Sequence, residues 1–384
     1  MAEFALANQE ILFVVPETTK GVLQVPTSAC RVYSTEPVDL GQERELIEDA
    51  QIRAGASNLP SIKARLMVGE WSFTTYVKAS GTKGTAPEAG ALFTALLGKK
   101  TVSSNTKVEY TLEDSLPSLS IWVKKGHTVF AVRGASVETG EFSIAGDAVA
   151  TVRWSGKFMQ RLWAGTSTLE DALNIGDTQV MLPTGHAKRY SEGMYIKFGA
   201  DDNSGAGYKI TSVDYTLDTL TITPGVKASH AKGTAIEPWL PTAAAEVGAP
   251  VHGKLGLVTI DGVPAVVLSA SLTVTNNIKY YDNEKNGVWT AEDFARPGKR
   301  TVEGTLSLFF LAQGLDYFYK ADYHEMDALV IPAGSEDGSI MELSIPYAEY
   351  SSPKLSGTEE FLQELSFKAV ASASLNDELK VIFR

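Results

Sequence analysis

Short runs rich in β-branched and aromatic residues recur along most of the chain and constrain its fold more than any other feature. The clearest runs are residues 69–78, 119–126, 128–137 and 148–158, which are bounded by Gly, Pro, Asn or Asp. These residue types favour strands, and many of the runs alternate between polar and apolar positions, as a strand with one buried face does. The sequence therefore predicts a mainly β fold.

Two segments follow a helical period instead. In residues 87–100, apolar residues recur three and four positions apart, and Pro87 and Gly98 stand where a helix starts and stops. Residues 314–326 carry a less regular apolar stripe, made of Leu315, Phe318, Tyr319 and Tyr323. We expect a short helix in each segment.

The two expected helices reveal a repeated order of elements. From Val25, strands are followed by a long polar loop at residues 36–62, a strand, the first helix and further strands. From Val263, the same order recurs around a polar loop at residues 278–299. The residue identities barely match, but the spacing does, so we predict two tandem copies of one β-rich unit of about 140 residues, each with a short helix.

Residues 165–240 differ in character from both units. They contain five short strand-like runs separated by Gly, Asn and Asp turns, with Gly-rich or Pro-rich hinges on either side. That spacing is typical of a small β-barrel or sandwich. We expect an inserted, outward-facing domain here, which leaves residues 1–164 and 241–384 as the tandem units.

Composition excludes several classes of protein. The 384 residues carry a formal net charge of −12, which argues against a protein that grips nucleic acid by neutralising phosphates. The single Cys30 allows neither an internal disulfide nor a cysteine-based zinc site. No apolar run reaches the roughly 18 to 20 residues of a membrane span, and Glu3 and Glu10 flank the N-terminal apolar patch without a basic leader. We expect a protein that is made in the cytoplasm and binds no membrane.

Motifs for catalysis or metal binding are weak. A calcium-loop pattern is matched in part by Asp282, Glu284, Asn286, Gly287 and Asp293. Its third position is Glu, its eighth is Trp and its twelfth is Asp instead of Glu, so a solvated polar loop is the better interpretation. The five histidines are isolated in the sequence, without a His-x-x-x-His pair. We expect no catalytic residue, no cofactor and no bound metal.

Two polar loops at corresponding places are candidate interaction arms. In the first, charges of both signs are interleaved at Glu43, Arg44, Glu48, Asp49 and Arg53. Interleaved signs can pair across an interface and fix its register, although a solvated loop or short helix would have the same composition. The second arm, residues 280–300, carries aromatic side chains suited to a buried contact, namely Tyr280, Tyr281, Trp289 and Phe294. We predict that both arms make contacts between subunits or between rings.

The order of these features resembles that of a known family. The long charged loop, the strand at 69–78, the short helix and the run VFAVRGASVETGEFSIAGDAVATVRWSGK resemble tail tube proteins of long-tailed, siphovirus-type bacteriophages. In the second unit, SASLTVTNNIKYYDN and GKRTVEGTLSLFF resemble the same family. The resemblance implies a β-sandwich with a flanking helix, no active site, and rings of six tube domains that stack into a channel for DNA.

The resemblance also implies how the chain assembles. Two tube domains per chain would let three chains complete a pseudo-hexameric ring, whereas six chains per ring would require one unit to be displaced to the outside. Implied partners are the tape-measure protein and the tail terminator and tip proteins. The tube would assemble in the host cytoplasm and belong to the virion tail. An acidic lumen would let DNA pass without specific binding.

Two rival classes stay open from the residues alone. One is a virion-surface or secreted β-sandwich that binds carbohydrate or a receptor on its aromatic residues. The other is an enzyme whose distant titratable side chains converge in a cleft. Rings or hollow tubes of the purified protein would distinguish the tube protein from both.

Overall fold

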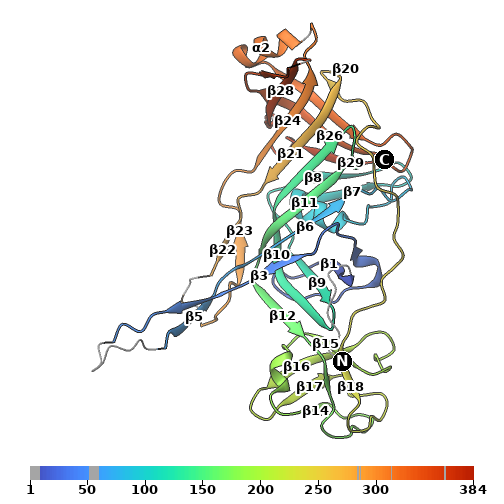
Figure 1. Ribbon diagram of the computed structural model, residues 1–384, viewed down its shortest axis with the longest axis vertical. Coiled ribbons are helices and arrows are strands. Elements are labelled where there is room, and N and C mark those ends of the chain that lie inside the picture. Colours follow the sequence, from blue (N-terminus) through green and yellow to red (C-terminus); the bar gives the residue numbers. More distant parts are fainter. Residues whose placement is uncertain (1–8, 52–59, 283–284, 286, 313, 359) are drawn as a thin grey trace.

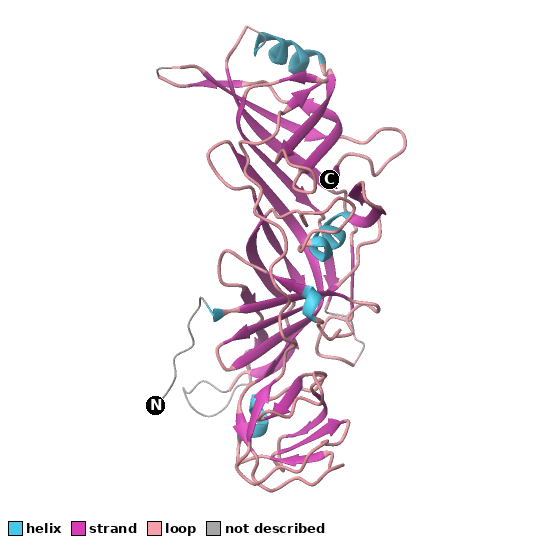
Figure 2. Cartoon of the chain, turned by 90° about the vertical axis from the view of Figure 1, so that its right-hand side faces the viewer, coloured by secondary structure: helices cyan, strands magenta, loops and turns pink. Residues whose placement is uncertain are grey.

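The computed structural model describes residues 9–51, 60–282, 285, 287–312, 314–358 and 360–384 of the chain. Across these residues the protein is mainly β with two α-helices, as the residue pattern predicts. Figures 1 and 2 show an elongated molecule, with α2 near one end of the long axis and the sheet of residues 165–240 at the other. Within the described residues, no helix combines the length and apolarity needed to cross a membrane.

A large antiparallel sheet runs through the centre of the molecule (Figure 1). Its strand order is β3 (Asp39–Gly41), β6 (Gly69–Tyr76), β11 (Thr151–Phe158), β10 (Thr128–Ala145), β21 (Val267–Thr275), β24 (Thr301–Phe309) and β28 (Leu362–Ala369). Early and late parts of the chain meet where β10 pairs with β21, from Thr139 opposite Thr275 to Ala145 opposite Ser269. Successive side chains point to opposite sides of a strand, so the sheet has one buried apolar face and one exposed polar face.

A second sheet shares strand β10 with the first. The N-terminal half of β10 pairs with β9 (Leu119–Lys125) and β12 (Gln160–Ala164), and β1 (Ile11–Pro16) and β2 (Arg31–Val32) continue the sheet beyond β9. The strand changes sheets around Gly134, where φ is 62°. A Cβ atom at this position would lie 2.3 Å from the sulfur of Met159, so both the backbone angle and the close packing require glycine.

The C-terminal strands extend the large sheet and close the core. β26 (Met341–Tyr350) pairs with β25 (Met326–Ala333) on one side and with β28 and β29 (Lys380–Phe383) on the other. β29 also pairs with β8 (Lys107–Leu112), which forms a hairpin with β7 (Gly98–Ser103). β19 (Thr259–Ile260) pairs with β25 and β20 (Val263–Pro264), and β27 (Lys354–Ser356) pairs with β28. One large hydrophobic core therefore includes residues from Leu12 to Phe383.

The two helices confirm the prediction from the sequence but differ in burial. α1 (Gly90–Leu97) lies within the core, whereas α2 (Gly314–Tyr323) lies on its surface. The apolar stripe from which α2 was predicted is not its buried face, because Leu315, Tyr319 and Tyr323 are exposed. α2 packs on the core through Tyr317 and Ala321 instead.

Residues 165–240 form a separate sheet of six strands, where the sequence predicts five. The order is β13 (Ser167–Thr168), β18 (Ala235–Pro238), β15 (Tyr195–Phe198), β16 (Tyr208–Asp214), β17 (Thr219–Thr223) and β14 (Gln179–Met181). The additional strand is the two-residue β13, which is too short to stand out in the sequence. The core of this insert continues into the second sheet, where it includes Phe13, Trp122 and Leu162. The insert therefore covers one face of that sheet.

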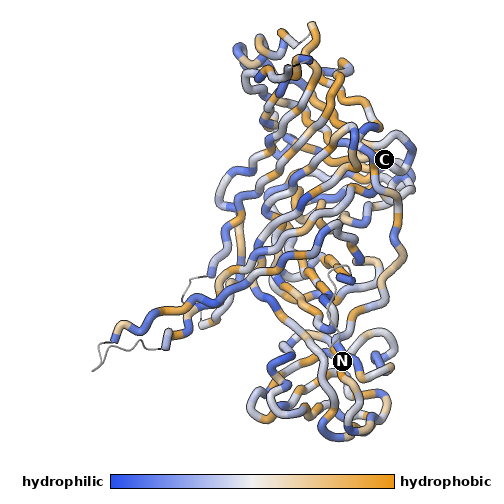
Figure 3. Tube along the Cα trace, in the orientation of Figure 1, coloured by the Kyte–Doolittle hydropathy of each residue, from blue (hydrophilic) through white to orange (hydrophobic). Residues whose placement is uncertain are grey.

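Both polar loops of the sequence contain hairpins. β4 (Arg44–Ile47) pairs with β5 (Ile62–Leu66) in the first arm, and β22 (Lys279–Tyr281) pairs with β23 (Asp293–Ala295) in the second. The first arm extends away from the body, and Figure 3 shows hydrophobic residues among the hydrophilic ones along it. The expectation of loops is wrong at these strands, because backbone pairing across each arm stabilises strands that the polar composition conceals.

Candidate functional surfaces

The exposed face of the large sheet is built mainly from small hydroxyl side chains. Trp71, Phe73 and Trp154 hold the opposite face in the core, so the alternate positions of their strands point outward. On five adjacent strands these outward positions include Ser72, Thr74, Ser143, Thr151, Ser155, Ser269, Ser271, Thr273, Thr275, Thr301, Thr305 and Ser307. The result is an even, polar surface of short side chains.

Charged residues on this face are sparse and more often acidic than basic. The outward charged positions include Glu70, Glu141, Glu303, Glu364, Arg153 and Lys368. A further cation, Lys157, lies 2.9 Å from a carboxylate oxygen of Glu138, which neutralises it. Proteins hold nucleic acid mainly through Lys and Arg, so a face with this balance of charge would not retain a polyanion.

The first arm places the predicted charged residues at the surface. Glu43, Arg44 and Glu48 are exposed, and Asp49 is partly exposed. Arg44 donates a hydrogen bond of 2.9 Å from Nη1 to the carbonyl of Ala64 on the opposite strand. The fifth predicted residue, Arg53, lies outside the described residues.

The same arm also carries apolar side chains that the charge pattern of the sequence does not indicate. Leu46, Ile47 and Ile62 are each more than half exposed, at 60%, 53% and 52%. Exposed apolar side chains gathered on a projecting hairpin are suited to contact with another chain. The Leu-Ile pair inside the charged run was the signal available in the sequence.

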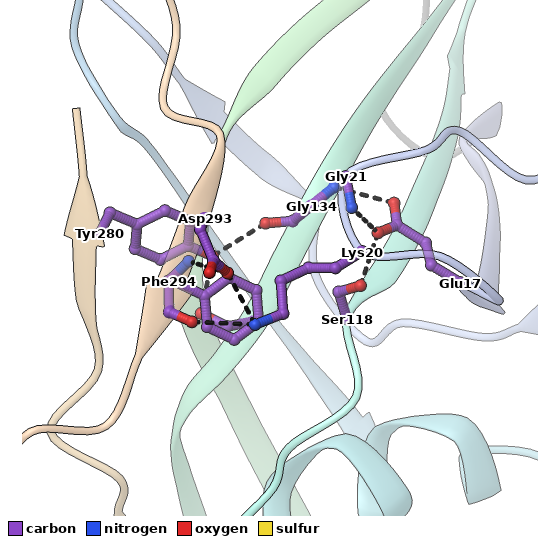
Figure 4. A network of polar contacts seen from close by, with 9 residues as sticks. Glu17, Lys20, Gly21, Ser118, Gly134, Tyr280, Asp293 and Phe294 are labelled. Carbon is purple, nitrogen blue, oxygen red and sulfur yellow. Dashed lines mark hydrogen bonds and ion pairs between the residues drawn. The ribbon is translucent and has the colours of Figure 1, made fainter. Parts of the chain in front are cut away.

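The second arm folds back onto its own chain. The hydroxyl of Tyr280 lies 2.8–2.9 Å from the carbonyl oxygens of Gly134 and Lys157, and the Phe294 ring packs against Tyr280 with 5.0 Å between centroids (Figure 4). The Lys20 ammonium is 2.8 Å from the carboxylate of Asp293 and 4.3 Å from the Phe294 ring centroid. Burial raises the pKa of Tyr280, which keeps its hydroxyl protonated.

The aromatic residues predicted to make contacts between subunits differ in whether another chain could reach them. Phe294 is only 4% exposed and makes its contacts within the chain, whereas Trp289 is 60% exposed. Tyr281 is partly exposed, and the ammonium of Lys279 lies 5.6 Å from its ring. Trp289 and Tyr281 are therefore the accessible members of the set, and the role of all three between subunits stays a prediction.

The second arm also braces the first. Arg65 of β5 forms an ion pair of 2.8 Å with Asp282, and the backbone N–H of Leu66 donates a 2.7 Å hydrogen bond to the carbonyl of Trp289. The Arg44 guanidinium lies 5.9 Å from the Trp289 ring. The two arms therefore form one composite projection at their base.

The calcium-loop pattern does not gather its carboxylates. Asp282 pairs with Arg65 and Asp293 pairs with Lys20, which direct the two carboxylates to different partners. Glu284 and Asn286 lie outside the described residues. In the part of the chain that the structure describes, no cluster of three His, Cys, Asp or Glu side chains could hold a metal.

The large sheet has an open edge at each end. Among the described strands, β3 pairs only with β6 and β27 only with β28. Asp39 and Lys354 are exposed on these two edges. An edge strand presents backbone N–H and C=O groups that can pair with another chain.

The comparisons with known proteins bear on all these surfaces. A family model described as phage tail tube protein matches residues 7–369. The matched region contains the large sheet, both arms, both helices and the insert. No curated protein sequence matches the chain.

Proposed function

The chain belongs to the phage tail tube protein family, and from that premise we propose that its exposed sheet face lines the channel of the tube. Family membership makes the protein a structural, non-enzymatic component of the virion tail. The observation that carries the proposal is the large sheet, with one face in the core, a polar opposite face and two open edges. Chains that pair edge to edge would close this sheet into a barrel, which removes the edges.

The channel proposal is tested by adding cations to the face. Ser155→Arg together with Ser271→Arg should slow DNA ejection from virions that carry the variant, because each new arginine can pair with phosphates. The delay should shrink as salt concentration rises. Thr216→Arg, on an exposed turn of the insert, is the matched control and should eject DNA at the normal rate. Equal rates for both variants would show that the face lies elsewhere in the tube.

We further propose that the chain contains two tandem tube-like units, residues 1–164 and 241–384, with residues 165–240 as an outward-facing insert. Support comes from the strand pairings, which recur in the same order in both units. The series β3–β6–β11–β10 of the first unit corresponds to β21–β24–β28–β26 of the second. In the same way, the pairs β1–β2, β9–β10 and β10–β12 correspond to β19–β20, β25–β26 and β26–β29. α1 follows β6 as α2 follows β24. The hairpin β7–β8 has no counterpart in this correspondence.

A ring of three chains follows from this correspondence. Within the chain, β10 of the first unit pairs with β21 of the second. Between chains, the strand equivalent to β10 is β27, because β27 continues the line of β26 along β28. The strand equivalent to β21 is β3 of the next chain. We propose that β27 of one chain pairs with β3 of the next, with Lys354 and Asp39 of opposite charge on the two edges.

The mass of isolated rings tests the stoichiometry. Native mass spectrometry should give three chains of 41.3 kDa per ring. Six chains per ring would contradict the arrangement, because one unit of each chain would then stand outside the channel wall.

The arms, in this proposal, connect successive rings. They start at the same ends of their strands, since the first arm precedes Gly69 of β6 and the second precedes Thr301 of β24. Gly69 and Thr301 both lie at the end of the large sheet that holds Phe158 and Thr275. Both arms therefore leave the sheet on one side, which in a stacked tube faces one neighbouring ring.

Charge reversal tests the stacking role. Glu48→Lys with Asp49→Lys, or Trp289→Ala, should leave rings intact and prevent their growth into tubes in electron micrographs. Asp171→Lys in the insert is the control and should form normal tubes. Normal tubes from the arm variants would show that the arms do not connect rings.

We place a tape-measure protein in the channel, terminator and tip proteins at the tube ends, and assembly of this siphovirus-type tail in the host cytoplasm.

A further inference from the structure

α2 exposes an aromatic and acidic face at one end of the molecule. Leu315, Tyr319 and Tyr323 are 64%, 53% and 66% exposed, and the two tyrosine rings stack with 4.3 Å between centroids. The exposed acidic residues of α2 and of the turn after it are Asp316, Asp322 and Glu325. A helix of a soluble protein normally turns its apolar stripe towards a core, so this face is suited to a protein contact.

A basic cleft lies towards the other end of the molecule, between β12, the base of the first arm and the insert. Its volume is about 900 Å³, and its lining includes the aromatic residues Trp163, Tyr195 and Tyr215. Its charged lining residues are Arg44, Arg133, Arg161, Lys209 and Glu192. The cleft is therefore basic and partly aromatic, which complements the acidic, aromatic face of α2.

The contact between the two halves of the chain provides a template for joining these surfaces. At that junction, Phe93 of α1 packs against Phe383 of β29 with 5.2 Å between ring centroids. Asn276, which follows β21, donates a 2.9 Å hydrogen bond to the carbonyl of Leu96 in α1. α1 is thus covered by β29 and by the residue that follows β21, both from the second half of the chain.

The same relation between chains would bring α2 to β12. In the proposed correspondence of the two units, α2 is equivalent to α1. Strand β12 is equivalent to β29, because β12 pairs with the first half of β10 and β29 pairs with the first half of β26. β12 lines the basic cleft. Figure 1 shows α2 and β12 towards opposite ends of the long axis, so chains arranged head to tail would place α2 of one beside β12 of the next.

We propose that α2 of each chain docks into the basic cleft of the next chain in the ring. This inference rests on the ring arrangement under Proposed function and adds the side-chain contact that accompanies edge pairing. Tyr319 and Tyr323 contact the aromatic side of the cleft, and the acidic residues of α2 face Arg161 and Lys209. The insert acquires a function in this arrangement, because its Tyr195 and Lys209 complete the cleft.

Photocrosslinking tests the docking. A benzoylphenylalanine replaces Tyr319, and tubes or rings are assembled from a mixture of unlabelled and ¹⁵N-labelled full-length chains before irradiation. Mass spectrometry should find crosslinks between differently labelled chains, with the partner peptide inside residues 160–164 or 191–215. The control places the same group at Tyr76, on the proposed channel face, and should give no crosslink to these peptides.

The outcomes separate the docking from the ring itself. Crosslinks from Tyr319 to another region of a neighbouring chain would leave the ring proposal standing and overturn the docking. A wild-type protein that forms neither rings nor tubes would overturn both.

A second measurement does not depend on the crosslinking chemistry. Tyr319→Asp should raise the protein concentration needed for ring formation by tenfold or more, measured by sedimentation, while the circular dichroism of the monomer stays unchanged. Ile175→Asp, at a residue of the insert that is 69% exposed, is the control and should assemble as the wild type does. Wild-type assembly of Tyr319→Asp would contradict the docking.

Discussion

α1 and α2 occupy similar places in the chain and opposite environments in the fold. Each follows a strand of the large sheet, β6 or β24, and each precedes an antiparallel pair. On α1, Leu92, Phe93 and Leu96 are at most 2% exposed. On α2, Leu315 and Tyr319 are more than half exposed.

The difference arises from what each helix finds next to it. The hairpin β7–β8, the strand β29 and Asn276 all lie against or beside α1. α2 packs on the core beside β26, and it is tied to β25 by the Lys320–Asp327 ion pair and to β28 by a hydrogen bond from Gln363 to the carbonyl of Gly314. The comparison teaches that the burial of a helix in this fold is set by the chain segments that pack beside it, not by the apolar stripe of the helix alone.

Removing the central ring of α1 should produce the largest effect. Phe93 contacts the rings of Tyr110, Trp154 and Phe383 at centroid distances of 5.3, 5.0 and 5.2 Å. Phe93→Ala should lower the free energy of unfolding by about 3–5 kcal/mol, because it leaves a cavity in the core. Tyr319→Ala in α2 should change it by no more than about 0.5 kcal/mol. Urea denaturation of the two monomeric variants measures both free energies of unfolding. Equal losses of stability would show that α1 and α2 do not differ in their contribution to the core.

Removing the link between α1 and the second half of the chain should have an intermediate effect. The side-chain N–H₂ of Asn276 donates to the carbonyls of Leu96 and Val137 at 2.9 and 3.1 Å, and its oxygen accepts from Arg300. Asn276→Ala should cost about 1–3 kcal/mol, because it leaves buried polar groups unpaired. Asn174→Ala, at an exposed asparagine of the insert, is the matched control in the same thermal unfolding assay. A neutral Asn276→Ala would mean that the junction does not hold α1.

A pH dependence at the bend of β10 should have the smallest effect. The carboxylate of Glu17 accepts hydrogen bonds from the backbone N–H groups of Gly21 and Gly134 and from the hydroxyls of Ser118 and Ser120. Burial raises the pKa of Glu17 despite these bonds. The stability linked to this group is therefore complete below its unfolded pKa and declines as the pH rises through its folded pKa.

The bend of β10 differs from the corresponding irregularity of β26, and a pH dependence should reveal this difference. β26 carries Pro346 at its irregularity, whereas Gly134 at the bend of β10 donates a backbone hydrogen bond to the buried carboxylate of Glu17. Melting temperatures measured at mildly acidic and neutral pH should show a shallower decline for Glu17→Gln than for the wild type. An unchanged slope would show that Glu17 does not titrate in this range.

Several features of the molecule followed from the sequence because they depend on neighbours along the chain. The alternation of residues 69–78 and 148–158 predicted β6 and β11, since strand periodicity is local. The same holds for α1, where Gly98 with φ of 112° ends the helix that the apolar spacing indicates. The pattern of such elements also carried the resemblance to the phage tail tube family.

Tertiary structure alone decided which surfaces these elements leave accessible. The sequence grouped Phe294 with Trp289 as contact residues, but packing against Tyr280 and Lys20 buries Phe294, whereas Trp289 stays exposed. It treated the first arm as a charged loop, because strand pairing between Ile47 and Ile62 spans residues far apart in the chain. The stripe of α2 was visible in the sequence, but its exposure depends on contacts from distant segments. Local periodicity fixes the elements, whereas pairing between remote strands decides which of their faces another chain can reach.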